Sequence, residues 1–248
     1  MNPLFAFQLR RVARNRQYLL FTVLLPALFT VFFTKIFGGM ASGPGEYQRQ
    51  AALSMVSMMA YGGLGAALGA TVRISFDRAS GWLRQLRVTP VPQTQVLAVD
   101  VAVGALLTLP SLVVVALVGR FVNGVQLGIG QWLALVGVLW AGAITFVALG
   151  ILLGLALDER AAGGAIGFVG VVLATLGGLW APVEVFPDSL RTLASAMPSY
   201  WYAQLGRDVA AGSPPSGTGV LVLAGFTAVF AVLATAVARH RPMHAVAG

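Results

Sequence analysis

The chain has 248 residues, of which 58% are hydrophobic and only 10% are charged, and its formal net charge is +8. A soluble domain carries about 25% charged residues to keep its surface wetted, so this composition excludes a water-soluble globule and predicts a protein solvated by lipid. The absence of cysteine excludes disulfides, thiolate catalysis and cysteine-ligated zinc.

The N-terminal segment, residues 1–17, has the pattern of a helix lying on a membrane surface. Its apolar residues share one helical face and its arginines occupy the other sides: Leu4, Phe5, Leu9 and Val12 against Arg10, Arg11, Arg14 and Arg16. Such a helix places apolar side chains at the acyl boundary and arginines on lipid phosphates. We therefore predict an interfacial amphipathic helix, with a basic tail as the alternative.

Six apolar segments follow, each close to the length that crosses a bilayer. They define a transmembrane domain over residues 18–238, with a tail over 239–248, and they lie at 18–37, 51–72, 96–118, 132–157, 164–180 and 218–238. Pro26 and Pro110 fall inside the first and third segments. Membrane helices tolerate such prolines when a neighbour satisfies the freed carbonyl. The predicted fold class is an all-α integral membrane protein with six transmembrane helices.

The basic residues between these segments are distributed unequally. Alternate connections, counted with both termini, hold eleven Lys and Arg on one side and five on the other. The positive-inside rule then places both termini in the cytoplasm, as an even number of spans requires. The high net charge is thereby explained as a topological signal, so nucleic-acid binding is not expected and the predicted location is the cytoplasmic membrane.

Small residues recur at four-residue spacing within three spans, as Gly62, Ala66 and Ala70, as Gly150 and Gly154, and as Gly170, Ala174 and Gly178. Such stripes let helix backbones approach closely in a membrane. Packing within the chain is the favoured interpretation, and a dimer face is the alternative.

The connection between the second and third spans, residues 73–95, has the pattern of a short amphipathic helix. Asp77 and Arg78 could cap it, and prolines end it. Its apolar residues recur at three- and four-residue spacing among arginines: Trp82, Leu83 and Leu86 with Arg84 and Arg87. A helix of this kind could dock another protein or rest on lipid head groups.

The same connection resembles the ABC-2 type transporter permeases. Their pattern is acidic–Arg–x–x–Gly–x–Leu–x–x–Leu followed by Thr-Pro, which here reads Asp77, Arg78, Gly81, Leu83, Leu86, Thr89 and Pro90. The acidic residue is Asp in place of the usual Glu, and Trp82 stands where a small polar residue is common. The resemblance implies a coupling helix over about residues 77–90 that fits a groove on a nucleotide-binding subunit. The implied ATPase-coupling residues are Asp77, Arg78, Gly81, Trp82, Leu83, Arg84, Leu86 and Pro90.

The long connection before the last span, residues 181–217, predicts two helices. The first would start near Pro187 and end before Pro198, and the second would cover about Tyr200 to Val209. Tyr200, Trp201 and Tyr202 form an aromatic cluster typical of membrane interfaces. The order of prolines, short helix and aromatic residues also resembles ABC-2 permeases, which implies an extracellular re-entrant helical pair over about residues 184–210. The residues expected at an extracellular gate are Pro182, Glu184, Pro187, Pro198, Tyr200 and Trp201.

Asp100 is the only acidic residue inside a predicted span. An intramembrane carboxylate is costly and is usually paired or functional. A partner arginine from the connection 73–95 would lock the third span to the coupling segment, and a proton or substrate site is the alternative. Glu184 and Asp188 could sense a cationic substrate, although solvated loop charges are the commoner explanation.

The sequence contains no G-x-x-x-x-G-K-[ST] phosphate-binding loop and no H-E-x-x-H metal motif. We therefore expect a transporter subunit and no enzyme, with no cofactor or metal in this chain. The resemblance implies an ABC exporter in which ATP and Mg²⁺ are bound by two copies of a separate ATPase. Two permease chains, identical or different, would face each other in the lipid around a pathway lined by spans one, two and five.

The expected cargo is hydrophobic or amphipathic, such as a drug, a lipid or a lipid-linked glycan, because intramembrane charges are few. An ATP-independent secondary transporter is the alternative, and a membrane enzyme is disfavoured by the missing catalytic groups. A secondary carrier would need ion sites at mid-membrane, for which Asp100 is the one candidate.

Overall fold

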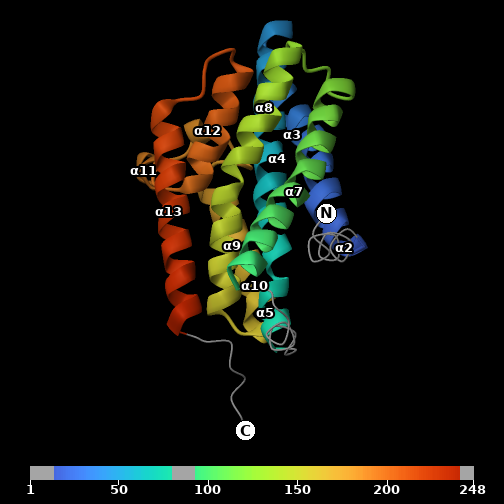
Figure 1. Cartoon of the computed structure of the whole chain (residues 1–248). Helices are drawn as coiled ribbons and strands as arrows, with labels where there is room; N and C mark the ends of the chain where they lie inside the picture. The colour runs from blue at the N-terminus through green and yellow to red at the C-terminus, as the bar shows by residue number, and fades with distance from the viewer. Residues whose placement is uncertain (1–13, 80–92, 241–248) are drawn as a thin grey trace.

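The computed structural model describes residues 14–79 and 93–240, and over these residues it is helical and contains no strand (Figure 1). Residues 1–13, 80–92 and 241–248 lie outside the described residues. They include most of the predicted interfacial helix (1–17), of the predicted coupling helix (77–90) and of the predicted tail (239–248). The helices in chain order are α2 (Arg16–Leu19), the π-helix η1 (Leu20–Leu24), α3 (Leu25–Gly38), α4 (Pro44–Thr71), α5 (Arg73–Ala79), α7 (Gln93–Phe121), α8 (Ile129–Gly142), α9 (Ile144–Ala156), α10 (Glu159–Leu176), the 3₁₀-helix η2 (Val183–Val185), α11 (Asp188–Ser195), α12 (Pro198–Ala210) and α13 (Gly217–His240).

The long helices run side by side and form a bundle with two ends (Figure 1). We call the end with connections 39–43, 122–128 and 211–216 the upper end, and the end with α5 and the last turns of α13 the lower end. The chain rises through α3, descends through α4, rises through α7 and descends through α8 and α9. It then returns upward through α10, α11 and α12 before α13 descends, so the described part of the chain begins and ends in the lower half.

Five segments are long and apolar enough to cross a membrane, namely Leu20–Gly38, Pro44–Phe76, Ala98–Phe121, Ile129–Ala156 and Gly217–Ala238. They correspond to five of the six predicted spans. The predicted span at 164–180 is represented by a shorter apolar helix, Arg160–Leu176. It ends there because Gly177 and Gly178 follow, and Gly178 adopts a left-handed φ of 69° that favours glycine. The count of six spans therefore stays a prediction.

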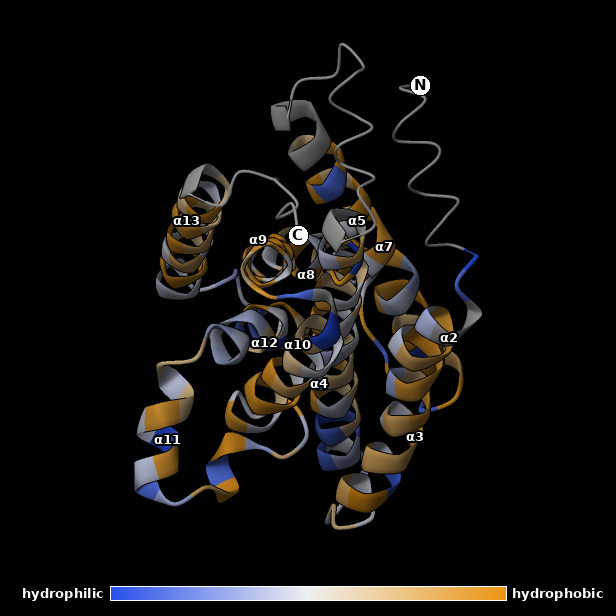
Figure 2. Ribbon diagram, turned by 90° about the horizontal axis from the view of Figure 1, so that it is seen from below, coloured by the Kyte–Doolittle hydropathy of each residue, from blue (hydrophilic) through white to orange (hydrophobic). Residues whose placement is uncertain are grey.

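Helix α4 forms the centre of the bundle and is the most buried of the five spanning segments. Seen along the bundle axis, the other helices surround it, while α13 lies at the periphery with apolar residues along its length (Figure 2). Helix α13 is the least buried span. In a bilayer its exposed apolar side chains would be solvated by lipid, so their exposure carries no cost.

Close helix packing occurs where the small-residue stripes predicted it. A Cβ atom at Gly150 would collide with the Thr71 side chain, and one at Gly154 would lie 3.0 Å from the Thr71 carbonyl oxygen, so glycine lets α9 approach α4. A Cβ at Gly62 would collide with the Ser111 hydroxyl of α7 and lie 3.2 Å from Pro26 of the first span. The interpretation of these glycines as contacts within the chain is confirmed.

The proline inside the first span is accommodated by a neighbouring helix. Pro26 has no N–H to donate to the carbonyl of Thr22, one turn earlier. The hydroxyl of Ser111 donates a hydrogen bond to that carbonyl at 2.6 Å. The π-helix η1 ends at Leu24, two residues before this proline, in keeping with the irregular backbone that proline imposes.

Two helices form between α10 and α13, where the sequence predicted two. Helix α11 ends at Ser195, and Pro198 occupies the first turn of α12, where its missing N–H costs nothing. Helix α12 packs against α4, α8 and α13. Its Tyr202 corrects the prediction of an interfacial aromatic cluster, because this side chain is completely buried and its hydroxyl donates to the Leu139 carbonyl at 2.9 Å. Successive helical residues face different directions, so Tyr202 lies in the core while Tyr200 and Trp201 are only partly buried.

Candidate functional site

The connection that contains the predicted coupling helix begins at the lower end of the bundle, directly after α4. Helix α5 continues α4 beyond Val72 and contains Asp77 and Arg78. Its Ile74 is buried, and α5 contacts α9 and α10. The remaining predicted coupling residues lie outside the described residues: Gly81, Trp82, Leu83, Arg84, Leu86 and Pro90.

Asp100 forms an ion pair with the first residue of the connection 73–95. The Nη2 atom of Arg73 donates to Oδ1 of Asp100 at 2.8 Å, and only 11% and 9% of the two side chains are exposed. The predicted pairing of Asp100 with an arginine of this connection is thus confirmed. The pair joins α5 to α7, two elements separated in sequence by the predicted coupling helix.

Arg73 carries hydrogen-bonding capacity beyond this pair. Its Nε and Nη1 atoms are buried and have no acceptor among the described residues. A buried guanidinium is costly unless it is paired. The position of Arg73 in the fold therefore depends strongly on the Asp100 carboxylate.

Tyr18 is a residue of the lower half that sequence reasoning missed. Its hydroxyl donates to the Ala66 carbonyl at 2.7 Å, and its ring lies where a Cβ at Gly69 would be 2.8 Å away. Tyr18 thus holds the start of the first span against α4. The sequence offered two signals for this contact, a tyrosine at the beginning of a span and the small residues of α4. Only the fold determines that these two features contact each other.

The residues predicted at the gate surround the turns between α10 and α12. Pro182 and Pro187 directly precede η2 and α11, and Glu184 lies within η2. Arg191 of α11 donates to the carbonyls of Val183 and Glu184 and so holds η2 against α11. Pro198 begins α12.

Tyr200 and Trp201 make an edge-to-face contact with ring centroids 5.3 Å apart. The indole N–H of Trp201 donates to the Ser195 carbonyl at 2.8 Å and so ties α12 to the end of α11. The ring centroid of Tyr200 lies 6.0 Å from Cζ of the Arg207 guanidinium, which is also part of α12. These contacts join η2, α11 and α12, the elements around which the predicted gate residues lie.

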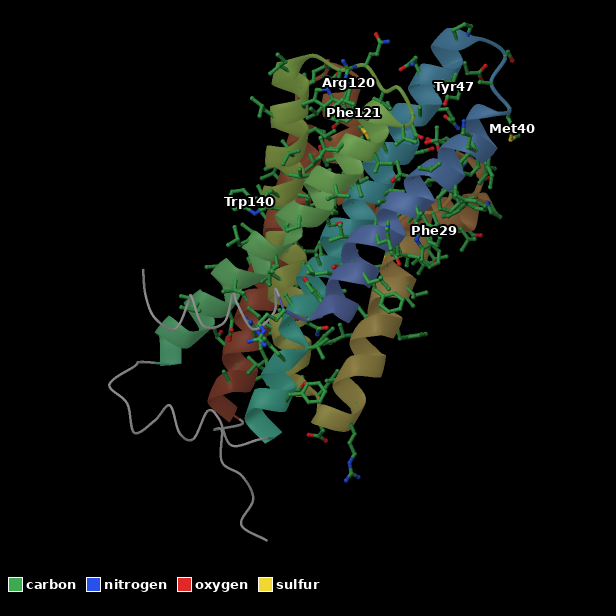
Figure 3. The ribbon with its side chains drawn as sticks, turned by 90° about the vertical axis from the view of Figure 1, so that its right-hand side faces the viewer. Phe29, Met40, Tyr47, Arg120, Phe121 and Trp140 are labelled. Carbon is green, nitrogen blue, oxygen red and sulfur yellow. The ribbon has the colours of Figure 1, made fainter. Side chains whose placement is uncertain are left out.

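A cavity of about 470 Å³ opens beside this segment, between the upper halves of α3 and α4. Met40 follows α3 and Tyr47 lies in the first turn of α4, at the upper end of the molecule (Figure 3). The cavity is bordered by the first and second spans and by residues 178–185, which follow α10. Of the predicted gate residues, Pro182 and Glu184 line it, whereas Pro187, Pro198, Tyr200 and Trp201 do not.

Four charged side chains line this cavity, and sequence reasoning singled out only Glu184 among them. The others are Glu46 and Arg49 of α4 and Arg207 of α12. Burial lowers the pKa of Arg207 from its ordinary value, while the charges of Glu184 and Asp208 act in the opposite direction. A guanidinium remains protonated at neutral pH under such conditions, so Arg207 presents a positive charge to the cavity.

The family model described as ABC-2 type transporter matches residues 3–210, and the chain belongs to this family. It is similar to "Putative transport permease YvfS" of Bacillus subtilis (strain 168), with 27% identity over 236 residues that cover 94% of this chain and 95% of the relative. The resemblance inferred from residues 77–90 is confirmed. The chain is a multi-pass membrane permease of a transport system, and its family implies an ATPase partner and a dimeric arrangement in general.

Proposed function

We propose that this chain is the membrane-spanning subunit of an ATP-driven exporter of hydrophobic or amphipathic compounds. Two copies of a separate ATPase would bind ATP and Mg²⁺ at the lower end, and a second permease chain, identical or different, would face this one. Transport would proceed by alternating access, with the cargo leaving past residues 181–210 at the upper end.

The ion pair between Arg73 and Asp100 is the observation that carries this proposal. It connects α5, which leads into the predicted coupling helix, with α7, which follows it. A force applied to the intervening segment is thereby delivered to two spans at once. Rigid-body movement of packed helices is one of the ways in which proteins transmit such a force.

Helix α4 provides a continuous path from this pair to the cavity at the upper end. Its last residue, Thr71, directly precedes the turn into α5, and its first turns contain Glu46 and Arg49 at the cavity. A 28-residue helix buried among its neighbours transmits displacement along its length because packed interiors deform little. The cavity borders the first and second spans and the end of α10, which agrees with a pathway along spans one, two and five.

The charge distribution supports placing the lower end in the cytoplasm. Arg73 begins the arginine-rich connection 73–95 and Arg160 lies in the first turn of α10, both at the lower end, and the N-terminal segment adds four arginines. The positive-inside rule favours the cytoplasm for this side. The outer face of the cytoplasmic membrane would then bear the cavity and helices α11 and α12, which would form the re-entrant pair.

An ATP-independent secondary transporter is the competing interpretation. It would require an ionisable group at mid-membrane that is available to a coupling ion. Asp100 is already paired with Arg73 at 2.8 Å, near the lower end of α7. This pairing favours a structural role for Asp100 and leaves the secondary mechanism without its one candidate group.

Reconstitution tests the proposed function. We expect the native complex to contain a P-loop ATPase, and we expect liposomes holding both proteins to export a lipophilic dye or a fluorescent phospholipid only when ATP and Mg²⁺ are present. The permease alone should move neither probe. Transport by the permease alone, or transport that an ion gradient drives without ATP, would refute the proposal.

Substitutions in the coupling segment should separate ATP hydrolysis from transport. We expect Arg84→Glu or Gly81→Trp to weaken ATPase docking about 30-fold, because removing a central contact of an interface costs about 2 kcal/mol. Membrane insertion should be unchanged. The measurements are ATPase affinity in detergent and ATP-dependent transport in liposomes.

Arg120→Glu is the matched control for Arg84→Glu, because it makes the same charge reversal in α7 at the upper end. It should leave ATPase affinity unchanged. Equal affinity for Arg84→Glu, Gly81→Trp and the unmodified chain would show that residues 77–90 do not couple the two subunits.

A further inference from the structure

The cavity at the upper end combines an apolar interior with a charged rim. Its walls include aromatic and aliphatic side chains from α3, from α4 and from the connection after α10, among them Phe33, Phe37, Leu53, Met58 and Leu179. Its volume of about 470 Å³ falls within the range of small-molecule sites, which is roughly 300 to 1,000 Å³. An apolar group of a ligand would be dehydrated favourably in such an interior.

The rim carries two positive and two negative side chains, namely Arg49, Arg207, Glu46 and Glu184. No two of them are close enough for a salt bridge within the described part of the chain, where the ion pairs lie elsewhere. The hydrogen bonds of Glu46 and Arg207 are with neutral groups, while the charges of Glu184 and Asp208 act on Arg207 without a salt-bridge contact. Glu46 accepts the Ser42 N–H at 2.7 Å, and Nη1 of Arg207 donates to Gln204 at 3.4 Å.

These four charges favour a ligand that carries charges of both signs. A purely apolar ligand would displace water from the half-buried Arg207 guanidinium. It would offer no hydrogen bond in place of that water, and this loss costs free energy. An anion would be attracted by two guanidinium groups and repelled by two carboxylates. A cation would be attracted by the two carboxylates and repelled by the two guanidinium groups. A zwitterionic group can direct a phosphate to the arginines, whose planar donors match phosphate oxygens, and an ammonium to the glutamates.

We propose that this cavity binds an amphiphile whose head group carries both a phosphate and an ammonium group, with an apolar chain in the cavity. Arg49 and Arg207 contact the phosphate, and Glu46 and Glu184 contact the ammonium group. The proposal concerns binding by this chain and does not require that the chain be an exporter. The amphiphile can come from the surrounding bilayer or be a separate cargo molecule.

Binding of single-chain lipids to the full purified chain in detergent tests the proposal. The probes are lysophosphatidylethanolamine, lysophosphatidylglycerol and an alkylamine of equal chain length, which differ in the charges of the head group. We expect the zwitterionic probe to bind about tenfold more tightly than either singly charged probe, because it alone makes both sets of charge-assisted hydrogen bonds. Equal or tighter binding of the anionic or cationic probe would overturn the assignment.

Charge-neutral variants locate the binding site. Arg207→Gln and Glu184→Gln should each weaken binding of lysophosphatidylethanolamine about tenfold through the loss of a charged contact. Arg120→Gln and Asp188→Asn are matched controls, because neither residue lines the cavity, and both should bind as the unmodified chain does. Arg49→Gln tests the same site at an exposed position, where folding is not at risk. Unchanged affinity in Arg49→Gln and in folded Arg207→Gln would show that the lipid binds elsewhere.

Nanodiscs distinguish the two sources of the amphiphile. If a bilayer lipid fills the cavity, phosphatidylethanolamine nanodiscs should block binding of added lysophosphatidylethanolamine, while phosphatidylglycerol nanodiscs should not. If the occupant is a separate cargo, the added probe should bind equally in both. Failure of the probe to bind in detergent and in either nanodisc would refute the site, whatever the outcome of the ATP-dependent transport assay.

Discussion

Replacing Asp100 by leucine should destabilise the protein by about 3 kcal/mol, because it leaves Arg73 buried without its carboxylate. Only 11% of the Arg73 side chain is exposed, and its Nε and Nη1 atoms already have no acceptor among the described residues. The measurement is the free energy of unfolding in detergent, followed by circular dichroism. The double variant Arg73→Leu/Asp100→Leu should recover much of the loss, since it removes both buried charges.

The exposed pair on α11 provides the matched control. Asp188 and Arg191 lie 3.7 Å apart, and the Asp188 side chain is fully exposed. We expect Asp188→Leu to change the free energy of unfolding by less than about 1 kcal/mol, as for exposed ion pairs in general. If Asp100→Leu were as mild as Asp188→Leu, the buried pair would not hold α5 against α7, and the coupling path would lose its basis.

The second large effect is expected at Gly62, where three helices meet. Gly62→Ala should destabilise the protein by about 3 kcal/mol, because the added methyl group collides with the Ser111 hydroxyl and presses on Pro26. Ser111 would then lose its hydrogen bond to the Thr22 carbonyl, which Pro26 cannot replace. The free energy of unfolding in detergent measures this effect.

Gly65 is the control for Gly62, since it lies three residues later in α4 and a Cβ there would contact nothing within 4 Å. We expect Gly65→Ala to stabilise the protein by about 0.5 kcal/mol through helix propensity alone. Equal effects of the two substitutions would mean that α4 does not approach α7 and the first span as closely as the structure indicates.

Together, the two sites explain why α4 suits the role of a connecting element. Its lower half is tied to the first span through Tyr18 and, by way of α5, to α7 through the ion pair. Its middle is fixed between Pro26 and Ser111. Its first turns reach the charged cavity. Displacement of the lower end would therefore move the cavity wall.

The sequence by itself determined that lipid solvates the protein, that its fold is helical, which family it belongs to, and that an arginine pairs with Asp100. Hydropathy predicted six spanning segments, and five of them are helices long and apolar enough to cross a membrane, because lipid requires long apolar helices whatever their neighbours are. The order of the coupling motif and of the helical pair before the last span indicated the family, because the residues of each motif are adjacent in the chain. Asp100 could be paired from the sequence since an intramembrane carboxylate requires a cation and arginines lay nearby.

The tertiary structure decided the features that depend on residues distant in sequence. Tyr202 is a core residue and Tyr200 is not, although both belong to one aromatic run, because the direction of each side chain follows from how α12 packs on α4 and α8. The return of the chain through α10, α11 and α12 depends on a left-handed glycine that hydropathy does not register. The charges of the cavity come from α4, η2 and α12, and only the packing of these elements brings them to one rim.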